Sequence, residues 1–252
     1  MPYFKYQGKQ CYYNESGQGN ILLLLHGNTA SSKMFDSITD LYKENYKVVV
    51  LDFLGHGQSD RIDRFPPDLW FDESMQVITF LEHMQYRQVN IIGSSGGALV
   101  ALNVALERPD LVNKVIADSF EGETPLADYV QNIKAEREAS KHDAAAKMFY
   151  EYNHGDDWEQ VVDNDTNALY THYQTIGKFF HKPLERLEMP ILLTGSKEDE
   201  FAPADFYETT YSALLNKMKN GSMYLFEKGG HPSILSSSNE FFKVADAFLK
   251  QN

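Results

Sequence analysis

The chain has 252 residues, 42% of them hydrophobic, with one cysteine and a formal net charge of −13. That length suits one large α/β domain, a single cysteine excludes an internal disulfide, and the acidity makes nucleic acid a poor partner. The chain starts with no basic and apolar leader and contains no apolar run near the roughly 20 residues that span a bilayer, so we expect a cytoplasmic protein that is not a membrane partner.

Short apolar runs alternate with helical patterns along most of the chain. A hairpin at the sheet edge is predicted where Gly8-Lys9 separates residues 4–7 from residues 11–13. Apolar runs then predict mainly parallel strands, and apolar residues at helical spacing predict helices between them. The strands are expected at 21–25, 47–51, 89–92, 112–117, 191–194 and 223–226, and helices at 71–84, 98–106 and 241–249. This alternation favours an α/β protein with a doubly wound sheet.

Residues 120–183 interrupt the alternation. This segment has no convincing strand pattern, is rich in charged and aromatic residues, and contains helical stretches over 126–146 and 158–180. We therefore predict a helical cap, residues 120–183, inserted into a core made of residues 1–119 and 184–252. No internal repeat or Pro-rich linker separates the two, so the cap is expected to elaborate one domain.

The sharpest local motif is Gly93-Ser94-Ser95-Gly96-Gly97, which lies between a predicted strand and a predicted helix. A nucleophile presented at the edge of a sheet needs a tight turn, and flanking glycines relieve the contacts around its strained backbone. The start of the following helix offers N–H groups to a developing oxyanion. Ser95 is therefore a candidate catalytic nucleophile.

A serine hydroxyl is a weak nucleophile, so it needs a base and an acid that orients the base. Downstream, the strand at 191–194 leads into an acidic loop that contains Asp199, and the strand at 223–226 leads into a turn that contains His231. Each feature alone is common in inert loops. Their joint order, Ser95, Asp199, His231, with each residue following a parallel strand, indicates a hydrolase triad.

The oxyanion site needs a second donor besides the turn at the nucleophile. The loop His26-Gly27-Asn28-Thr29 follows the strand at 21–25 and can bend toward that turn. We expect the backbone N–H groups of Asn28 and Gly96 to form the pair of donors. We interpret His26 itself as a structural brace.

Together, these motifs resemble the α/β-hydrolase superfamily. The resemblance rests on His26-Gly27, on the loop from Asp52 to Asp60 (DFLGHGQSD), on Gly93-x-Ser95-x-Gly97, on the acid loop 195–203, and on Gly230-His231. It covers nearly the whole chain outside the cap. It implies an α/β-hydrolase fold, a Ser95-Asp199-His231 triad, an architectural role for the Asp52 loop, and no cofactor. The expected partner is a small-molecule substrate, and the expected state is a monomer or homodimer.

The resemblance does not by itself fix which carboxylate is the acid of the triad. Relatives often place it three residues after the first glycine of the acid loop, which would be Glu198, whereas the spacing back from Pro203 indicates Asp199. Others supply it after the strand before the cap, where this chain has Asp118. The related epoxide hydrolases and dehalogenases carry aspartate in place of Ser95, so those activities are disfavoured.

The layout is most similar to small carboxylesterases and to carbon–carbon bond hydrolases. Amino-ester hydrolases among the former carry an acidic residue just after the nucleophile, where this chain has Gly96. We therefore expect a serine hydrolase acting on an ester or related acyl bond. The alternatives are a carbon–carbon bond hydrolase and a slow-turnover ligand sensor on the same fold. A metal site at His154, Asp156 and Asp157 is disfavoured because their spacing matches no strong ligand pattern.

Overall fold

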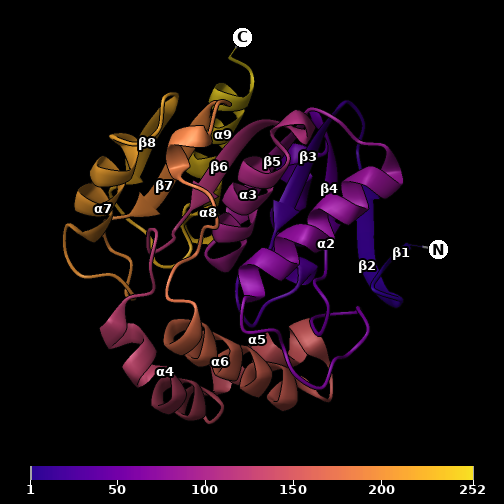
Figure 1. Ribbon diagram of the computed structural model, residues 1–252, viewed down its shortest axis with the longest axis vertical. Coiled ribbons are helices and arrows are strands. Elements are labelled where there is room, and N and C mark those ends of the chain that lie inside the picture. The colour runs from indigo at the N-terminus through magenta and orange to yellow at the C-terminus, as the bar shows by residue number, and fades with distance from the viewer. Residues whose placement is uncertain (1, 252) are drawn as a thin grey trace.

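An eight-stranded sheet forms the centre of the computed structural model, which describes residues 2–251 (Figure 1). Its strand order is β1-β2-β4-β3-β5-β6-β7-β8. The strands are β1 (Tyr3–Tyr6), β2 (Lys9–Ser16), β3 (Asn20–Leu25), β4 (Tyr46–Leu51), β5 (Val89–Ser94), β6 (Val112–Asp118), β7 (Ile191–Ser196) and β8 (Gly221–Phe226). Strand β2 pairs antiparallel with β1 and β4, and the other neighbours pair in parallel. The predicted edge hairpin and mainly parallel sheet are confirmed.

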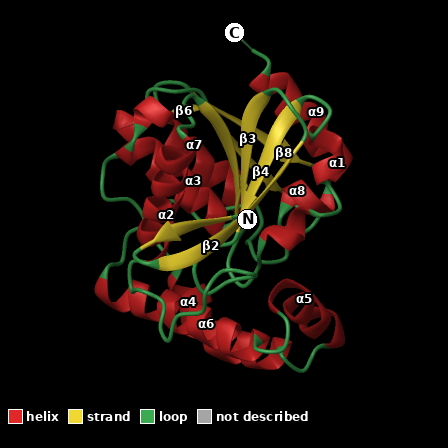
Figure 2. Cartoon of the chain, turned by 90° about the vertical axis from the view of Figure 1, so that its right-hand side faces the viewer, coloured by secondary structure: helices red, strands yellow, loops and turns green. Residues whose placement is uncertain are grey.

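Helices cover both faces of the sheet (Figure 2). The α-helices are α1 (Thr39–Tyr42), α2 (Leu69–Met84), α3 (Gly96–Glu107), α4 (Ala127–Ser140), α5 (Ala144–His154), α6 (Trp158–Thr175), α7 (Phe206–Leu215), α8 (Ser233–Ser236) and α9 (Ser238–Leu249). Short 3₁₀ turns occupy Ser32–Phe35, Pro109–Leu111 and Leu184–Arg186. Within the described residues, no helix combines the length and the apolar character needed to cross a bilayer.

The strand sequences explain this layering. Successive side chains of a strand point to opposite faces, so a continuous apolar run fills two cores at once. In β3, Leu23 and Leu25 belong to the same buried cluster as residues of α2, α3 and α7, while Leu22 and Leu24 belong to a second cluster with residues of α1, α8 and α9. All four leucines are fully buried. The sheet is thus buried between two helical layers. The loops at the ends of its strands are therefore where we expect the reacting side chains.

Helices α4, α5 and α6 follow β6 and form a separate layer beneath the core in both views (Figures 1 and 2). The helical stretch predicted over 126–146 is two helices, because the Asp143 side chain accepts hydrogen bonds from two backbone N–H groups and starts α5. The stretch predicted over 158–180 ends at Thr175, shortly before Gly177 at φ 72°. The division into a core of 1–119 and 184–252 and a cap of 120–183 stays a prediction.

Candidate active site

Ser95 lies in the tight turn between β5 and α3. Its backbone has φ 55° and ψ −120°, a strained conformation for a residue with a side chain. The flanking glycines make this turn possible: a Cβ on Gly93 would lie 2.1 Å from the carbonyl oxygen of Gly97, and a Cβ on Gly97 would lie 2.2 Å from that of Leu25. The local sequence therefore forces the Ser95 side chain out at the end of the central strand.

His231 and Asp199 meet at the ends of β8 and β7. The Nδ1 atom of His231 lies 2.9 Å from Oδ2 of Asp199, whose side chain is fully buried. That oxygen also accepts a 2.6 Å bond from the Tyr207 hydroxyl, and Oδ1 accepts one from the Phe201 N–H. Burial acts to raise the pKa of the Asp199 carboxyl, but His231, Tyr207 and Phe201 outweigh it and hold that pKa below its ordinary value. Asp199 therefore stays ionised beside the imidazole.

The two other candidate acids do not contact this imidazole. Glu198 is exposed to solvent. Asp118 is fully buried, and it accepts hydrogen bonds from the Ser233 hydroxyl at 2.6 Å and from the Ile234 N–H at 3.0 Å. It thereby fixes the start of α8, directly after the turn that carries His231. The geometry favours Asp199 as the partner of the histidine.

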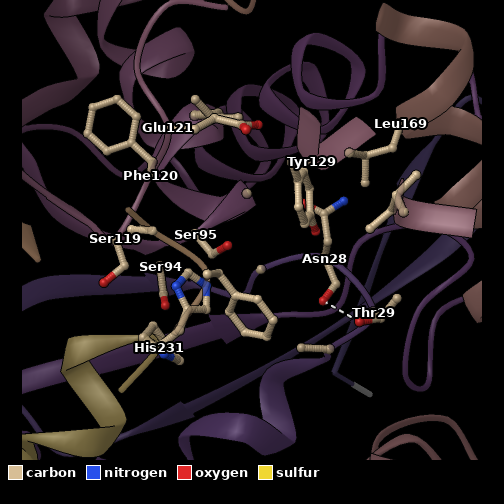
Figure 3. Close-up of a pocket in the computed structure, with 18 of the residues that line it drawn as sticks. Asn28, Thr29, Ser94, Ser95, Ser119, Phe120, Glu121, Tyr129, Leu169 and His231 are labelled. Atoms are coloured by element: carbon tan, nitrogen blue, oxygen red, sulfur yellow. Dashed lines mark hydrogen bonds between the residues drawn. The ribbon is translucent and has the colours of Figure 1, made fainter. Parts of the chain in front are cut away.

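The Ser95 side chain and the His231 imidazole are neighbours in one cavity (Figure 3). No direct hydrogen bond joins them in the described part of the chain. Catalytic hydrogen bonds are often long without substrate and tighten only when substrate binds. The three residues predicted from the sequence are thus brought to one edge of the sheet, with the His231–Asp199 bond already formed.

The loop carrying Asn28 lies against the nucleophile turn. A Cβ on Gly27 would lie 3.0 Å from Cβ of Ser95, and one on Gly96 would lie 2.2 Å from Oδ1 of Asn28. Within residues 2–251, neither the Asn28 N–H nor the Gly96 N–H donates a hydrogen bond. Both donors therefore remain open beside Ser95. A side chain at position 96 would therefore have to displace the Asn28 amide.

Asp165, on α6, was not predicted from the sequence and connects that helix to this loop. Its carboxylate is fully buried and its Oδ2 atom accepts hydrogen bonds from the Asn28 side chain at 2.9 Å and the Thr29 N–H at 3.1 Å. Thr29 has φ 54°, so its unusual backbone is held by this contact. A charged residue in a polar helix carries no sequence signal for such a role.

Two buried histidines, His26 and His154, brace the loops around the site. His26 accepts the Phe53 N–H on Nε2, which agrees with the predicted structural role. His154 accepts the Gly57 N–H on Nδ1 and bonds the Thr29 carbonyl through Nε2, and its ring lies 5.8 Å from that of His56. Within the described chain, no group of three or more His, Cys, Asp or Glu residues is arranged to hold a metal ion.

Because these histidines are buried, we expect the stability of the folded protein to fall at acidic pH. Burial lowers the pKa of His154 to about 3, whereas an unfolded histidine titrates near 6.5. The unfolded state therefore takes up the proton first, so stability is full above pH ~6.5 and falls as the pH drops toward 3. From this residue alone we expect the free energy of unfolding to decrease by about 2 kcal/mol between pH 7 and pH 5.

Urea unfolding at pH 5, 6 and 7 measures this loss. The His154→Gln variant is expected to lose less stability on acidification than the unmodified protein. His142→Gln is the control, because the His142 side chain is 80% exposed. An equal pH dependence in the unmodified protein and the His154→Gln variant would show that His154 is not the titrating group.

A cavity of about 530 Å³ lies between the site and helices α4, α5 and α6. The core contributes the loop at Asn28, the nucleophile turn and His231, whereas α4, α5 and α6 contribute apolar, aromatic and charged side chains. In Figure 3, Tyr129 of α4 and Leu169 of α6 lie on the side of the cavity that carries Asn28. Burial raises the pKa of Glu121 to about 7. The volume suits a small organic molecule.

Comparisons with known proteins agree with this architecture. A family model described as alpha/beta hydrolase fold matches residues 20–139. Serine hydrolase BPHL of Mus musculus is 26% identical over 96% of this chain and 84% of its own length. A 2-hydroxy-6-oxo-6-(2'-aminophenyl)hexa-2,4-dienoic acid hydrolase of Metapseudomonas resinovorans is 22% identical over 97% of this chain and 89% of its own length.

Solved structures show the same fold at lower identity. The enol-lactonase from Burkholderia xenovorans LB400 superposes with a TM-score of 0.79 at 14% identity, covering 99% of this chain and 100% of that one. An esterase from Exiguobacterium antarcticum gives a TM-score of 0.76 at 19% identity, with 97% of each chain covered.

Proposed function

Because the chain is an enzyme of the α/β-hydrolase superfamily, we propose that it is a serine hydrolase that cleaves an ester or related acyl bond of a small molecule. The observation that carries the proposal is the 2.9 Å bond between His231 and the buried Asp199, next to Ser95 in one cavity. This is the arrangement that a weak hydroxyl nucleophile requires: a base beside it and an anion that orients the base.

The reaction follows from the protonation states. Asp199 accepts the Nδ1 proton of His231, which leaves Nε2 unprotonated and able to take the Ser95 proton as the hydroxyl attacks the acyl carbonyl. The open N–H groups of Asn28 and Gly96 stabilise the oxyanion that develops. His231 then protonates the leaving group, and an acyl-enzyme forms. Water activated by the same imidazole releases the acid and restores Ser95.

A carbon–carbon bond hydrolase is the second candidate. Its support is the likeness to the Metapseudomonas resinovorans hydrolase, whose name describes a 2-hydroxy-6-oxo dienoic acid substrate. Both reactions need the same nucleophile and oxyanion donors, so the cavity alone does not separate them.

Covalent labelling tests the proposal. A fluorophosphonate is expected to modify the folded protein once, on the peptide that contains Ser95, because only an activated serine displaces fluoride at a useful rate. Mass spectrometry of the digested protein locates the adduct, and heat-denatured protein is the control. Modification elsewhere, or none at all, would contradict the assignment of Ser95.

Steady-state turnover of a panel of substrates separates the alternative functions. We expect multiple turnovers of p-nitrophenyl esters of short acids, measured by release of p-nitrophenol. Thioester, amide and 2-hydroxy-6-oxo dienoate substrates complete the panel, and faster turnover of the last would favour the carbon–carbon reaction. A labelling burst without turnover of any member would favour a slow-turnover sensor instead.

A further inference from the structure

Arg137, on the cap helix α4, brings a positive charge to the wall of the cavity. Its side chain is only 13% exposed, and its Nη1 atom is buried without a hydrogen-bond partner within residues 2–251. Among the residues that line the cavity, it is the only lysine or arginine. Burial acts to lower the pKa of the guanidinium, but Tyr129 and Asp165 outweigh it and raise that pKa, so the group stays charged. A buried cation with an unmet donor is costly unless a partner arrives.

Asp165 does not supply that partner. The closest approach, from Nη2 of Arg137 to Oδ1 of Asp165, is 3.9 Å, which is too long for a hydrogen bond. The other carboxylate oxygen is already committed to Asn28 and Thr29. Asp165 therefore offsets the charge of Arg137 from a distance, while Nη1 of the guanidinium stays without an acceptor within residues 2–251.

The remaining acidic groups on the cavity wall oppose an anion only weakly. Glu136 is exposed to solvent, where water screens its charge. Glu121 accepts a hydrogen bond from the Leu126 N–H at 3.3 Å and is partly protonated near neutral pH. Most of the other lining residues are apolar or aromatic. The cavity thus has its nucleophile on the core side and one fixed cation on the cap side.

We propose that Arg137 is a substrate-binding residue and that the substrates of this site carry a carboxylate at the end remote from the scissile bond. The inference rests on the proposed acyl hydrolysis at Ser95. A planar guanidinium presents paired N–H donors that match the two oxygens of a carboxylate. The apolar walls then accommodate the carbon chain between the carboxylate at Arg137 and the acyl carbonyl at Ser95.

The test compares two esters that differ only at the far end of the acyl chain: the p-nitrophenyl monoester of adipic acid, which ends in a carboxylate, and p-nitrophenyl hexanoate, which ends in a methyl group. The measured quantity is the ratio of kcat/KM for the two esters. In Arg137→Gln we expect this ratio to fall about 10- to 100-fold, chiefly through KM of the adipate ester. Arg137→Lys should recover part of the loss, because it keeps the charge without the paired donors.

Lys134→Gln is the matched control. It removes one positive charge from the same helix at an exposed position, and it should leave the ratio unchanged. The rate at which each variant hydrolyses p-nitrophenyl hexanoate reports whether the enzyme is folded. An unchanged ratio in Arg137→Gln, or an equal fall in Lys134→Gln, would overturn the proposal.

A binding measurement separates this inference from the proposed function. If neither ester is turned over, the proposed ester hydrolysis fails, and calorimetric titration with hexanoate and with hexanamide then tests the carboxylate site directly. We expect hexanoate to bind more tightly than hexanamide to the unmodified protein, with the difference lost in Arg137→Gln. Equal binding of the two probes by the unmodified protein would overturn the site itself.

Discussion

Ser95→Ala is expected to lower kcat for p-nitrophenyl butyrate by about 10⁵- to 10⁶-fold, the size of loss seen when a triad nucleophile is removed. Without the hydroxyl no acyl-enzyme can form, although the open N–H groups of Asn28 and Gly96 still polarise the carbonyl. The protein should remain folded, because the Ser95 hydroxyl makes no hydrogen bond within residues 2–251. Its φ of 55° is equally strained for alanine.

The rate is measured by release of p-nitrophenol at high enzyme concentration, and thermal unfolding of the same sample checks the fold. Ser94→Ala is the matched control, since it deletes the neighbouring hydroxyl, which is buried without a partner. That variant should retain most of the turnover. If Ser95→Ala also retained it, the nucleophile would have to be another group.

The sheet and the nucleophile turn could be predicted because their signals are local. The apolar run 21–25 is too continuous for a surface strand, and glycines at 93 and 97 stand where a side chain would collide with the backbone. The same reasoning placed His231 after a strand. In each case a few neighbouring residues determine the conformation, so one sequence is sufficient.

The contacts made by Asp165, Arg137 and Tyr207 could not be predicted in the same way. Asp165 bonds to residues more than 130 positions earlier in the chain, and its helix is polar enough to pass for a solvated one. Tyr207 lies on α7, a helix that was not predicted from the sequence, and its hydroxyl donates a hydrogen bond to the buried Asp199. Such contacts depend on how the cap and the outer helices pack, and that packing leaves no periodic pattern.

Identifying the acid that orients His231 required both the spacing of residues in the sequence and the burial of their side chains in the structure. Spacing from the first glycine of the acid loop indicated Glu198, whereas spacing back from Pro203 indicated Asp199, the predicted acid. The backbone then separates them, because the Asp199 side chain is buried toward His231 and the Glu198 side chain is exposed. A shift of one residue in such a loop reverses the direction of a side chain.

Asp199→Asn is accordingly expected to lower kcat by about 10⁴-fold, with little change in KM. In the unmodified protein Oδ2 of Asp199 accepts from both His231 Nδ1 and the Tyr207 hydroxyl, so His231 keeps its proton on Nδ1. An amide that turns its NH₂ toward His231 favours the opposite tautomer, in which Nε2 carries the proton and cannot accept the one from Ser95. The effect is measured on p-nitrophenyl butyrate near pH 7.5, alongside Glu198→Gln, which removes a solvated charge and should leave kcat nearly unaltered. A greater loss in Glu198→Gln than in Asp199→Asn would mean that the neighbouring glutamate orients the histidine during turnover.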